Sequence, residues 1–287
     1  MDHSSKRYEV DPASHRLRLD RFLAKVIPEL HARAIDRLLR GGHVRIGAKV
    51  GTAHHFVKRG NVVIVDFPKI TVGEPRILHE SSHAIALAKP PGMPTAGIGT
   101  ETLLHWLGGR LHKTPGVIHR LDRETSGLVL FSLSPGGHRL LEDLFRRREI
   151  SKTYWAMIAG RISPASGTID FPLGPVRSGR VRVDPEGKVA ATSYRTLETG
   201  SSWSLLELSP RTGRTHQIRV HLAAQGHPVI GDALYGQPTP VLAQPRLWLH
   251  AGKLALPGAM AERLDLPPMI ECPLWPDLAA HHARLTT

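Results

Sequence analysis

One aspartate in the sequence has the neighbours that a reactive carboxylate needs. Asp122 lies between Arg120 and Arg123 in the run His-Arg-Leu-Asp-Arg-Glu-Thr-Ser-Gly (119–127), which leads into the apolar segment 128–131. Opposite charges nearby favour the ionised form of a carboxylate, even where burial opposes it. The sequence therefore predicts that Asp122 is an anion able to act as a nucleophile. For an isolated Arg-x-Asp, a surface ion pair between Arg120 and Asp122 is the simpler alternative.

A second polar segment, residues 210–222, reads Pro-Arg-Thr-Gly-Arg-Thr-His-Gln-Ile-Arg-Val-His-Leu and follows a strand-like run. Its apolar spacing, with a Gly and a Pro just beyond, predicts a short helix over 215–225. Arg214 follows a glycine and precedes this helix, so its side chain could reach an acid on another strand. The alternative is that Arg214 and Arg219 are solvated charges on a helix face.

Together with Lys-Thr-Tyr at 152–154, these segments resemble the signature of the RluA family of pseudouridine synthases. The family pattern is His-Arg-Leu-Asp, two variable positions and Thr-Ser-Gly, then Lys-x-Tyr, then Gly-Arg-x-His-Gln-x-Arg-x-His, and it occurs here in that order. Further runs agree, namely Lys-Pro-Pro-Gly at 89–92, Gly-His-Pro-Val-Ile-Gly-Asp at 226–232 and Leu-His-Ala at 249–251. The resemblance covers roughly residues 76 to 285.

The resemblance implies roles for particular residues. Asp122 matches the catalytic aspartate, Tyr154 the tyrosine that stacks on the target base, and Arg214 the arginine paired with the aspartate. Arg120 matches the residue that enters the gap left by a flipped-out nucleotide. We also expect RNA contacts from Lys152, His216, Gln217 and Arg219.

The implied chemistry suits these residue types. Conversion of uridine to pseudouridine breaks a carbon–nitrogen glycosidic bond, turns the base and rejoins it through carbon five, so no cofactor is expected. Asp122 could attack either the ribose or the uracil ring. The last proton could leave to Asp122 or to the Tyr154 hydroxyl. Extruding a stacked uridine costs a few kcal/mol, and stacking on an aromatic face returns roughly 1 to 3 kcal/mol.

The overall charge indicates a polyanionic substrate. The chain has 38 Lys and Arg against 25 Asp and Glu, a formal net charge of +13. Residues 1–69 alone hold fourteen basic and seven acidic side chains. Phosphates are the natural counter-charge for such a surplus.

Residues 17–67 have the pattern of a small separate domain with two amphipathic helices followed by short strands. Arg33, Arg37 and Arg40 recur at helical spacing and predict a basic ridge, although such a ridge is more often only a solvated helix side. The runs at 19–24, 37–47 and 57–61 resemble the alpha-L RNA-binding domain. We therefore expect phosphate contacts from this domain, with Arg45 added to the three helical arginines.

The sequence also predicts the domain organisation. We expect a flexible tail over residues 1–16, the RNA-binding domain over 17–67, a linker over 68–75 and the catalytic domain over 76–287. Because strands and helices do not alternate regularly, a doubly wound fold is not expected. The fold class predicted is α+β, a mixed and mostly antiparallel sheet with flanking helices and loops, preceded by the small RNA-binding domain.

The catalytic part gives the following expected elements. Strands are predicted at 84–88, 117–121, 128–133, 154–158, 189–197 and 203–208, and helices at 102–111, 136–148 and 215–225.

Several classes of function are disfavoured. No apolar run of 18 residues is present, and the first residues lack the pattern of a signal peptide, so we expect a cytoplasmic protein without a membrane partner. The one cysteine, Cys272, permits no internal disulfide and no cysteine-based zinc cluster. Because His216 and His221 are five apart on the predicted helix and the other histidines are scattered, no metal site is expected. A monomer is the default.

Alternatives remain open for the substrate and for the reaction. Ribosomal RNA, and 23S ribosomal RNA in particular, is favoured by the N-terminal domain, with transfer RNA as the alternative. A non-catalytic RNA-binding or ribosome-assembly protein would tolerate Asp122→Asn, and a glycosylase would release free uracil.

Overall fold

The computed structural model describes residues 4–28, 32–67, 73–112, 114–236 and 246–286, without the side chains of residues 32–34 and 37. The chain divides into two compact units. One comprises residues 1–71 with 230–245, and the other residues 72–229 with 246–287.

The described part of the N-terminal unit contains a four-stranded antiparallel sheet and two α-helices. Its elements are β1 (Ser4–Glu9), a 3₁₀ helix (Pro12–Ser14), α1 (Leu19–Val26), α2 (Ala32–Arg40), β2 (Val44–Ile46), β3 (Lys49–Val50) and β4 (Val62–Phe67), and the sheet order is β1-β4-β2-β3. Leu19, Phe22 and Leu23 are buried at helical spacing and share one apolar core with Val63 and Val65 of β4. This core is what the apolar pattern of residues 17–67 predicts.

The predicted tail over residues 1–16 is wrong for its middle part. Residues 4–9 form β1, which pairs antiparallel with β4 from Ser4 opposite Phe67 to Glu9 opposite Val62. The strand reads Ser-Ser-Lys-Arg-Tyr-Glu, so it has no apolar alternation that a sequence pattern could detect. Its backbone hydrogen bonds to β4 stabilise it instead. Residues 68–72 of the predicted linker lie outside the described residues.

The second unit contains, in its described part, the larger sheet and five helices. Its strands are β5 (Arg76–Glu80), β6 (Ala84–Lys89), β7 (Gly116–Val117), β8 (Ser126–Ser132), β9 (Ser151–Ala159), β10 (Ser166–Ile169), β11 (Thr192–Thr199), β12 (Trp203–Pro210), β13 (Leu249–Ala255) and β14 (Met269–Glu271). Its helices are α3 (Leu103–Leu111), α4 (Pro135–Arg147), α5 (Gln217–Ala224), α6 (Gly258–Arg263) and α7 (Pro276–Thr286).

The sheet of this unit runs in the order β10-β11-β12-β9-β13-β8-β6-β5, with β14 on β13 and β7 on β8. Among these strands every pairing is antiparallel except that of β13 with β8. The predicted α+β class with a mostly antiparallel sheet is therefore confirmed.

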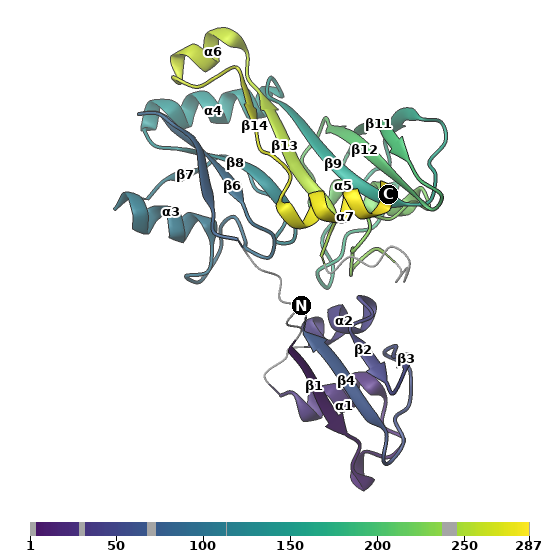
Figure 1. The fold of residues 1–287 in the computed structure, drawn as a ribbon. Coiled ribbons are helices and arrows are strands. Elements are labelled where there is room, and N and C mark those ends of the chain that lie inside the picture. The colour runs from purple at the N-terminus through teal and green to yellow at the C-terminus, as the bar shows by residue number, and fades with distance from the viewer. Residues whose placement is uncertain (1–3, 29–31, 68–72, 113, 237–245, 287) are drawn as a thin grey trace. The chain divides into compact units, whose positions relative to one another are not determined.

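Alternating side chains of β6 and β8 face two apolar clusters on opposite sides of the sheet. Ala86 and Leu130 join Leu141 of α4, whereas Leu87 and Val129 join residues of α3. Both strands are buried throughout, and Figure 1 shows α3 and α4 on either side of them. Strands covered on both faces read as continuous apolar runs, as these do.

Local signals account for the ends of α3 and α4. The side chain of Thr102 accepts a hydrogen bond from the backbone N–H of His105 at the start of α3, and Ser134 accepts one from Gly137 at the start of α4. Such caps satisfy backbone donors that a helix start leaves unpaired. Both helices lie within one residue of their predicted bounds.

The predicted strand 117–121 is wrong beyond Val117, where β7 ends. The backbone N–H and C=O of Leu121 are bonded to the side chain of Thr95 and not to a strand. The backbone hydrogen bonds that a neighbouring strand would make with Leu121 are therefore made by the side chain of Thr95.

Among the described residues, the structure contains no helix with the length and hydropathy that a membrane span requires.

The parallel pairing of β8 with β13 depends on a glycine. Gly127 has φ +120° and lies opposite Ala251, and a Cβ added to it would stand 2.2 Å from the carbonyl oxygen of Ala251. Only a residue without a side chain allows so close an approach of two backbones at this φ.

We expect Gly127→Ala to lower the free energy of unfolding by about 3 kcal/mol, because it combines backbone strain with a steric clash. Urea unfolding of the purified protein measures this change. Gly136→Ala is the control, since Gly136 lies in α4 with no atom near its added Cβ. A loss of stability equal in the two variants would contradict this role of Gly127.

Candidate active site

Strand register brings the predicted catalytic segments to one place. Tyr154 of β9 lies opposite Ala251 of β13, and Ala251 lies opposite Gly127 of β8. On its other side Tyr154 lies opposite Leu208 of β12. The loop that carries Asp122 leads into β8, and the segment that carries Arg214 and Arg219 follows β12. Four adjacent strands therefore deliver these segments to the same region of the sheet.

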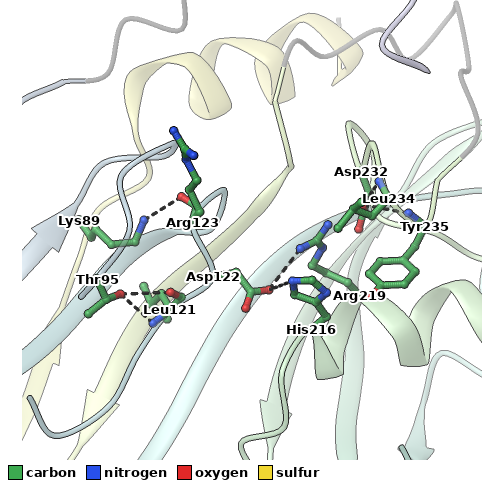
Figure 2. Close-up of polar contacts among 10 residues, drawn as sticks. All are labelled: Lys89, Thr95, Leu121, Asp122, Arg123, His216, Arg219, Asp232, Leu234 and Tyr235. Atoms are coloured by element: carbon green, nitrogen blue, oxygen red, sulfur yellow. Dashed lines mark hydrogen bonds and ion pairs between the residues drawn. The ribbon is translucent and has the colours of Figure 1, made fainter. Parts of the chain in front are cut away.

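Asp122 lies in this loop with its carboxylate directed at the side chains of Arg219 and His216. Its Oδ2 is 3.4 Å from Nη1 of Arg219 and 4.0 Å from Nε2 of His216, as Figure 2 shows. The Arg219 side chain is 4% exposed, whereas that of Asp122 is 23% exposed. The arginine is thus fixed by burial in α5, and the carboxylate keeps access to an incoming molecule.

The predicted pairing of Arg214 with Asp122 is corrected by these contacts. Nε of Arg214 donates to the carbonyl oxygen of Val189 at 3.2 Å, and Arg219 makes the contact with Asp122 in its place. The two arginines are five residues apart, and only Arg219 lies within α5. The helix directs Arg219 toward the loop, whereas Arg214 precedes it.

The sequence predicts an RNA contact for Gln217, but its amide is used within the protein. Its Oε1 accepts hydrogen bonds from Thr212 Oγ1 and from the backbone N–H of Arg214, and its Nε2 donates to Ala191 O and Thr192 Oγ1. The residue is 4% exposed. Its four hydrogen bonds use the capacity of an amide, so Gln217 shapes the loop before α5.

Tyr154 lines the same space, and its hydroxyl is held in the neutral form. Burial, and secondly the negative charge of Asp122, raise the pKa of Tyr154. A neutral phenol presents an aromatic face and an O–H donor, but it is a poor acceptor of a further proton.

His119, the first residue of the motif, is also neutral. Its Nε2 accepts a hydrogen bond from the backbone N–H of Leu130 at 3.0 Å, and its ring stacks on Phe145 with centroids 4.7 Å apart. Burial and then the charge of Lys152 lower the pKa of His119 to about 3. His119 therefore ties the motif to β8 as an uncharged ring.

These residues line a cleft of about 1140 Å³. Among the described residues that line it, Asp122 is the one acidic side chain. The basic lining residues are Arg120, Arg123, Arg148, Lys152, Arg211, Arg214 and Arg219, with His119 and His216 beside them. A cleft with this lining attracts a polyanion and directs it toward a single carboxylate.

Arg148 is a cleft residue that the sequence patterns do not single out. It caps the C-terminus of α4 in the left-handed conformation, with φ +61°. Its charge lowers the pKa of Lys152, although burial of Lys152 has the larger effect in the same direction. Nζ of Lys152 stands 4.0 Å from the position a Cβ would take on Gly213. A left-handed cap followed by a strand is a weak sequence signal, so only the structure reveals Arg148.

A buried polar network supports the end of the Asp122 loop. Ser126 Oγ lies 2.9 Å from His250 Nδ1 and accepts a hydrogen bond from Arg246 Nη1 at 3.2 Å. Nε2 of His250 faces the carbonyl oxygen of Cys272, so it carries the ring proton and Nδ1 accepts from Ser126. Arg246 in turn makes a two-point ion pair with Asp277 of α7. The network joins β8, β13 and α7 directly behind the loop.

The predicted basic residues of the N-terminal unit have different surroundings. Arg40 pairs with Asp36 at 2.8 Å, and Arg45 pairs with Asp66 at 3.2 Å. Both arginine side chains remain partly exposed, at 36% and 40%. The side chains of Arg33 and Arg37 lie outside the described part of the chain.

Comparisons with known proteins identify the family of this chain. Residues 83–224 match the family model described as RNA pseudouridylate synthase. An uncharacterized RNA pseudouridine synthase from Chloroflexus aurantiacus is 38% identical over 268 residues, which cover 86% of this chain and 84% of the relative. Ribosomal large subunit pseudouridine synthase D from Nitrosomonas europaea is 33% identical over 289 residues, covering 92% and 83%.

A solved structure shows the same likeness. Human RNA Pseudouridylate Synthase Domain Containing 4 matches with a TM-score of 0.62 and 28% identity, over 73% of this chain and 92% of that one. The fold is thus that of an RNA-modifying isomerase. The chain belongs to the RluA family of RNA pseudouridine synthases.

The contact of Arg219 with Asp122 predicts that Arg219 matters more for catalysis than Arg214. We expect Arg219→Met to lower the rate of pseudouridine formation by about 100-fold, because removing one partner leaves a partly buried carboxylate without its counter-charge. Arg214→Met is the matched control and should reduce the rate by less than about tenfold, since its contact is a single carbonyl. Single-turnover rates at saturating enzyme measure both.

A larger loss from Arg214→Met than from Arg219→Met would contradict the assignment and restore the pairing predicted from sequence.

Proposed function

We propose that this enzyme isomerises specific uridines of large-subunit ribosomal RNA, with Asp122 as the nucleophile and with base flipping onto Tyr154. The observation that carries this proposal is the position of Asp122, the one acid among the described lining residues of a basic cleft, beside an aromatic side chain. The proposal takes the enzyme to act as a monomer in the cytoplasm, because the described residues of one chain supply every group that it names.

The lining charges favour an RNA strand over a small neutral substrate. Arg120, Arg148 and Lys152 lie on the walls of the cleft, where each can neutralise a backbone phosphate. Arg120 is exposed, so it is free to enter the space that the flipped nucleotide leaves in the RNA. Such contacts position the strand but do not identify the uridine.

The reaction is balanced within one nucleotide. The bond from ribose carbon one to uracil nitrogen one breaks, the base turns, and a bond forms from the same ribose carbon to carbon five. Carbon five loses a proton and nitrogen one gains one, so no electron acceptor is needed. Asp122 assists by attacking either the ribose or the uracil ring, which holds one fragment while the other turns.

The arginine behind Asp122 sets the geometry of this attack. Because the side chain of Arg219 is nearly fully buried, its contact holds one carboxylate oxygen, Oδ2, while the side chain of Asp122 stays 23% exposed. Catalytic contacts of this kind are often long in a substrate-free enzyme and shorten when substrate binds. The distance of 3.4 Å between Nη1 and Oδ2 fits that description.

Tyr154 then acts as the platform for the base. Its raised pKa keeps the hydroxyl protonated at neutral pH, so it is a weaker proton acceptor than a carboxylate. This favours Asp122 over Tyr154 as the group that takes the proton from carbon five. Stacking of uracil on the ring contributes about 1 to 3 kcal/mol toward holding the base outside the RNA stack.

The N-terminal unit supports a ribosomal substrate. Its surplus of basic residues and its resemblance to the alpha-L RNA-binding domain suit contact with structured RNA. Relatives that cover most of this chain are named large-subunit ribosomal enzymes. Transfer RNA remains the alternative substrate.

Incubation of the protein with unmodified 23S ribosomal RNA and transfer RNA transcripts distinguishes these substrates. Carbodiimide adducts at pseudouridine stop reverse transcriptase, so new stops identify each modified position. We expect stops at one or a few uridines of 23S ribosomal RNA. Stops only in transfer RNA would show that transfer RNA is the substrate. Release of free uracil would show that the enzyme is a glycosylase and not an isomerase.

Deleting residues 1–67 tests the role of the N-terminal unit. We expect weaker RNA binding and a smaller dependence of affinity on salt, because the logarithmic slope falls by about 0.7 to 0.9 for each phosphate that the protein no longer neutralises. Binding is measured by fluorescence anisotropy at salt concentrations from about 50 to about 300 mM, over which the affinity changes enough to give the slope. Arg33→Gln with Arg37→Gln is the companion variant, because it removes two positive charges and keeps residues 1–67 in the chain. An unchanged slope in both would exclude this unit from the RNA interface.

A further inference from the structure

A loop distant in sequence holds the backbone on both sides of Asp122. It comprises residues 89–95, from the last residue of β6 through the first part of the connection to α3, and we name it the 89–95 loop. On the N-terminal side of Asp122, Oγ1 of Thr95 donates to the carbonyl oxygen of Leu121 at 3.1 Å and accepts from the N–H of the same residue at 3.1 Å. Thr95 is 1% exposed.

Lys89 makes the matching contact on the C-terminal side. Its Nζ donates to the carbonyl oxygen of Arg123 at 3.1 Å, as drawn in Figure 2, and to those of Pro90 at 2.8 Å and Met93 at 2.7 Å. Nε of Arg123 returns a hydrogen bond to Gly92 at 2.8 Å. Asp122 is therefore the residue between two anchored peptide units.

A buried lysine at position 89 destabilises the folded protein unless its hydrogen-bond donors have partners. Lys89 is fully buried, and burial of an unpartnered ammonium group costs several kcal/mol. An ammonium group has three donors and no acceptor, and here three carbonyl oxygens receive them. An apolar side chain would fill the same space without the desolvation cost of an ammonium group. It could not donate hydrogen bonds to the carbonyl oxygens of Pro90, Met93 and Arg123.

Neighbouring charges shift the pKa of Lys89 both downward and upward. Burial lowers the pKa of Lys89 to about 7, and the charges of Arg246 and Arg123 add to this effect. The carboxylates of Glu124 and Asp122 raise it. Lys89 thus interacts favourably with the same carboxylate that contacts Arg219.

We propose that Lys89 and Thr95 are positioning residues, which fix the backbone at Asp122 so that its carboxylate meets both Arg219 and the substrate. The inference rests on the proposed role of Asp122 as the nucleophile. Neither residue needs to touch RNA, because each acts through the peptide units of Leu121 and Arg123. A displacement of about 1 Å at a reacting group can reduce a rate by about 100-fold, so small loop movements are sufficient.

The pair Thr95→Val and Thr95→Ser separates positioning from packing. Valine keeps the shape and removes the hydroxyl, whereas serine keeps the hydroxyl. We expect Thr95→Val to lower the single-turnover rate constant by about tenfold or more, and Thr95→Ser to stay within about threefold of wild type. The RNA dissociation constant should stay within about threefold in both, because neither variant removes a phosphate contact.

Lys89→Met extends the test to the other side of Asp122. We expect a loss of about 100-fold in the same rate constant. Lys253→Met is the control, because it removes a partly exposed ion pair with Glu271. Circular dichroism confirms that the compared variants are folded at the assay temperature. Folded Thr95→Val and Lys89→Met proteins that react at the wild-type rate, or that lose only RNA affinity, would overturn the proposal.

Hydrogen exchange gives a readout that is independent of turnover. We expect Thr95→Val to speed amide exchange in the peptide that contains Leu121 and Asp122 by about tenfold, and Thr95→Ser to leave it near wild type. Unchanged exchange in Thr95→Val would overturn the positioning role. A wild-type protein that forms no pseudouridine in any RNA would instead overturn the proposed function.

Discussion

The contact between Asp122 and Arg219 joins the two sides of the catalytic sheet, and most of the site depends on it. Asp122 is carried by the loop before β8, whereas Arg219 is carried by α5 after β12. Strands β13 and β9 lie between them, so the distance of 3.4 Å exists only because four strands keep their register. Gly127 permits the pairing of β8 with β13.

Buried polar groups then hold the loop from behind. The network of Ser126, His250 and Arg246 fixes its end, while His119 ties its start to β8. Polar groups in a protein interior are unfavourable unless each is hydrogen-bonded, and here Ser126, His250 and Arg246 are bonded to one another or to the backbone. A nucleophile that must reach the same atom in every turnover benefits from that rigidity.

The sequence predicts the parts of the site that lie within one motif. Asp122, Tyr154 and the polar segment before α5 follow from residue types in a known order, and α3 and α4 from their caps and apolar spacing. The predicted pairing of Arg214 is wrong because two arginines of one motif are five residues apart, and the sequence does not show which one the helix directs at the acid. The contacts of Thr95 and Lys89 with the loop, and the strand β1, depend on partners about 25 to 60 residues away, as the long-range pairings show. No local pattern encodes such contacts.

The nucleophilic role of Asp122 is tested most directly by the reactivity of Asp122→Asn. The single-turnover rate of pseudouridine formation and the RNA dissociation constant should be measured together for this variant, for wild type and for Asp143→Asn, an acid on the surface of α4. Asparagine keeps the size of the side chain and removes the negative charge. We predict a rate at least about 1000-fold below wild type with an affinity within about threefold, because covalent catalysis needs the carboxylate and RNA binding does not. A rate near that of wild type would show that the chemistry belongs to another residue.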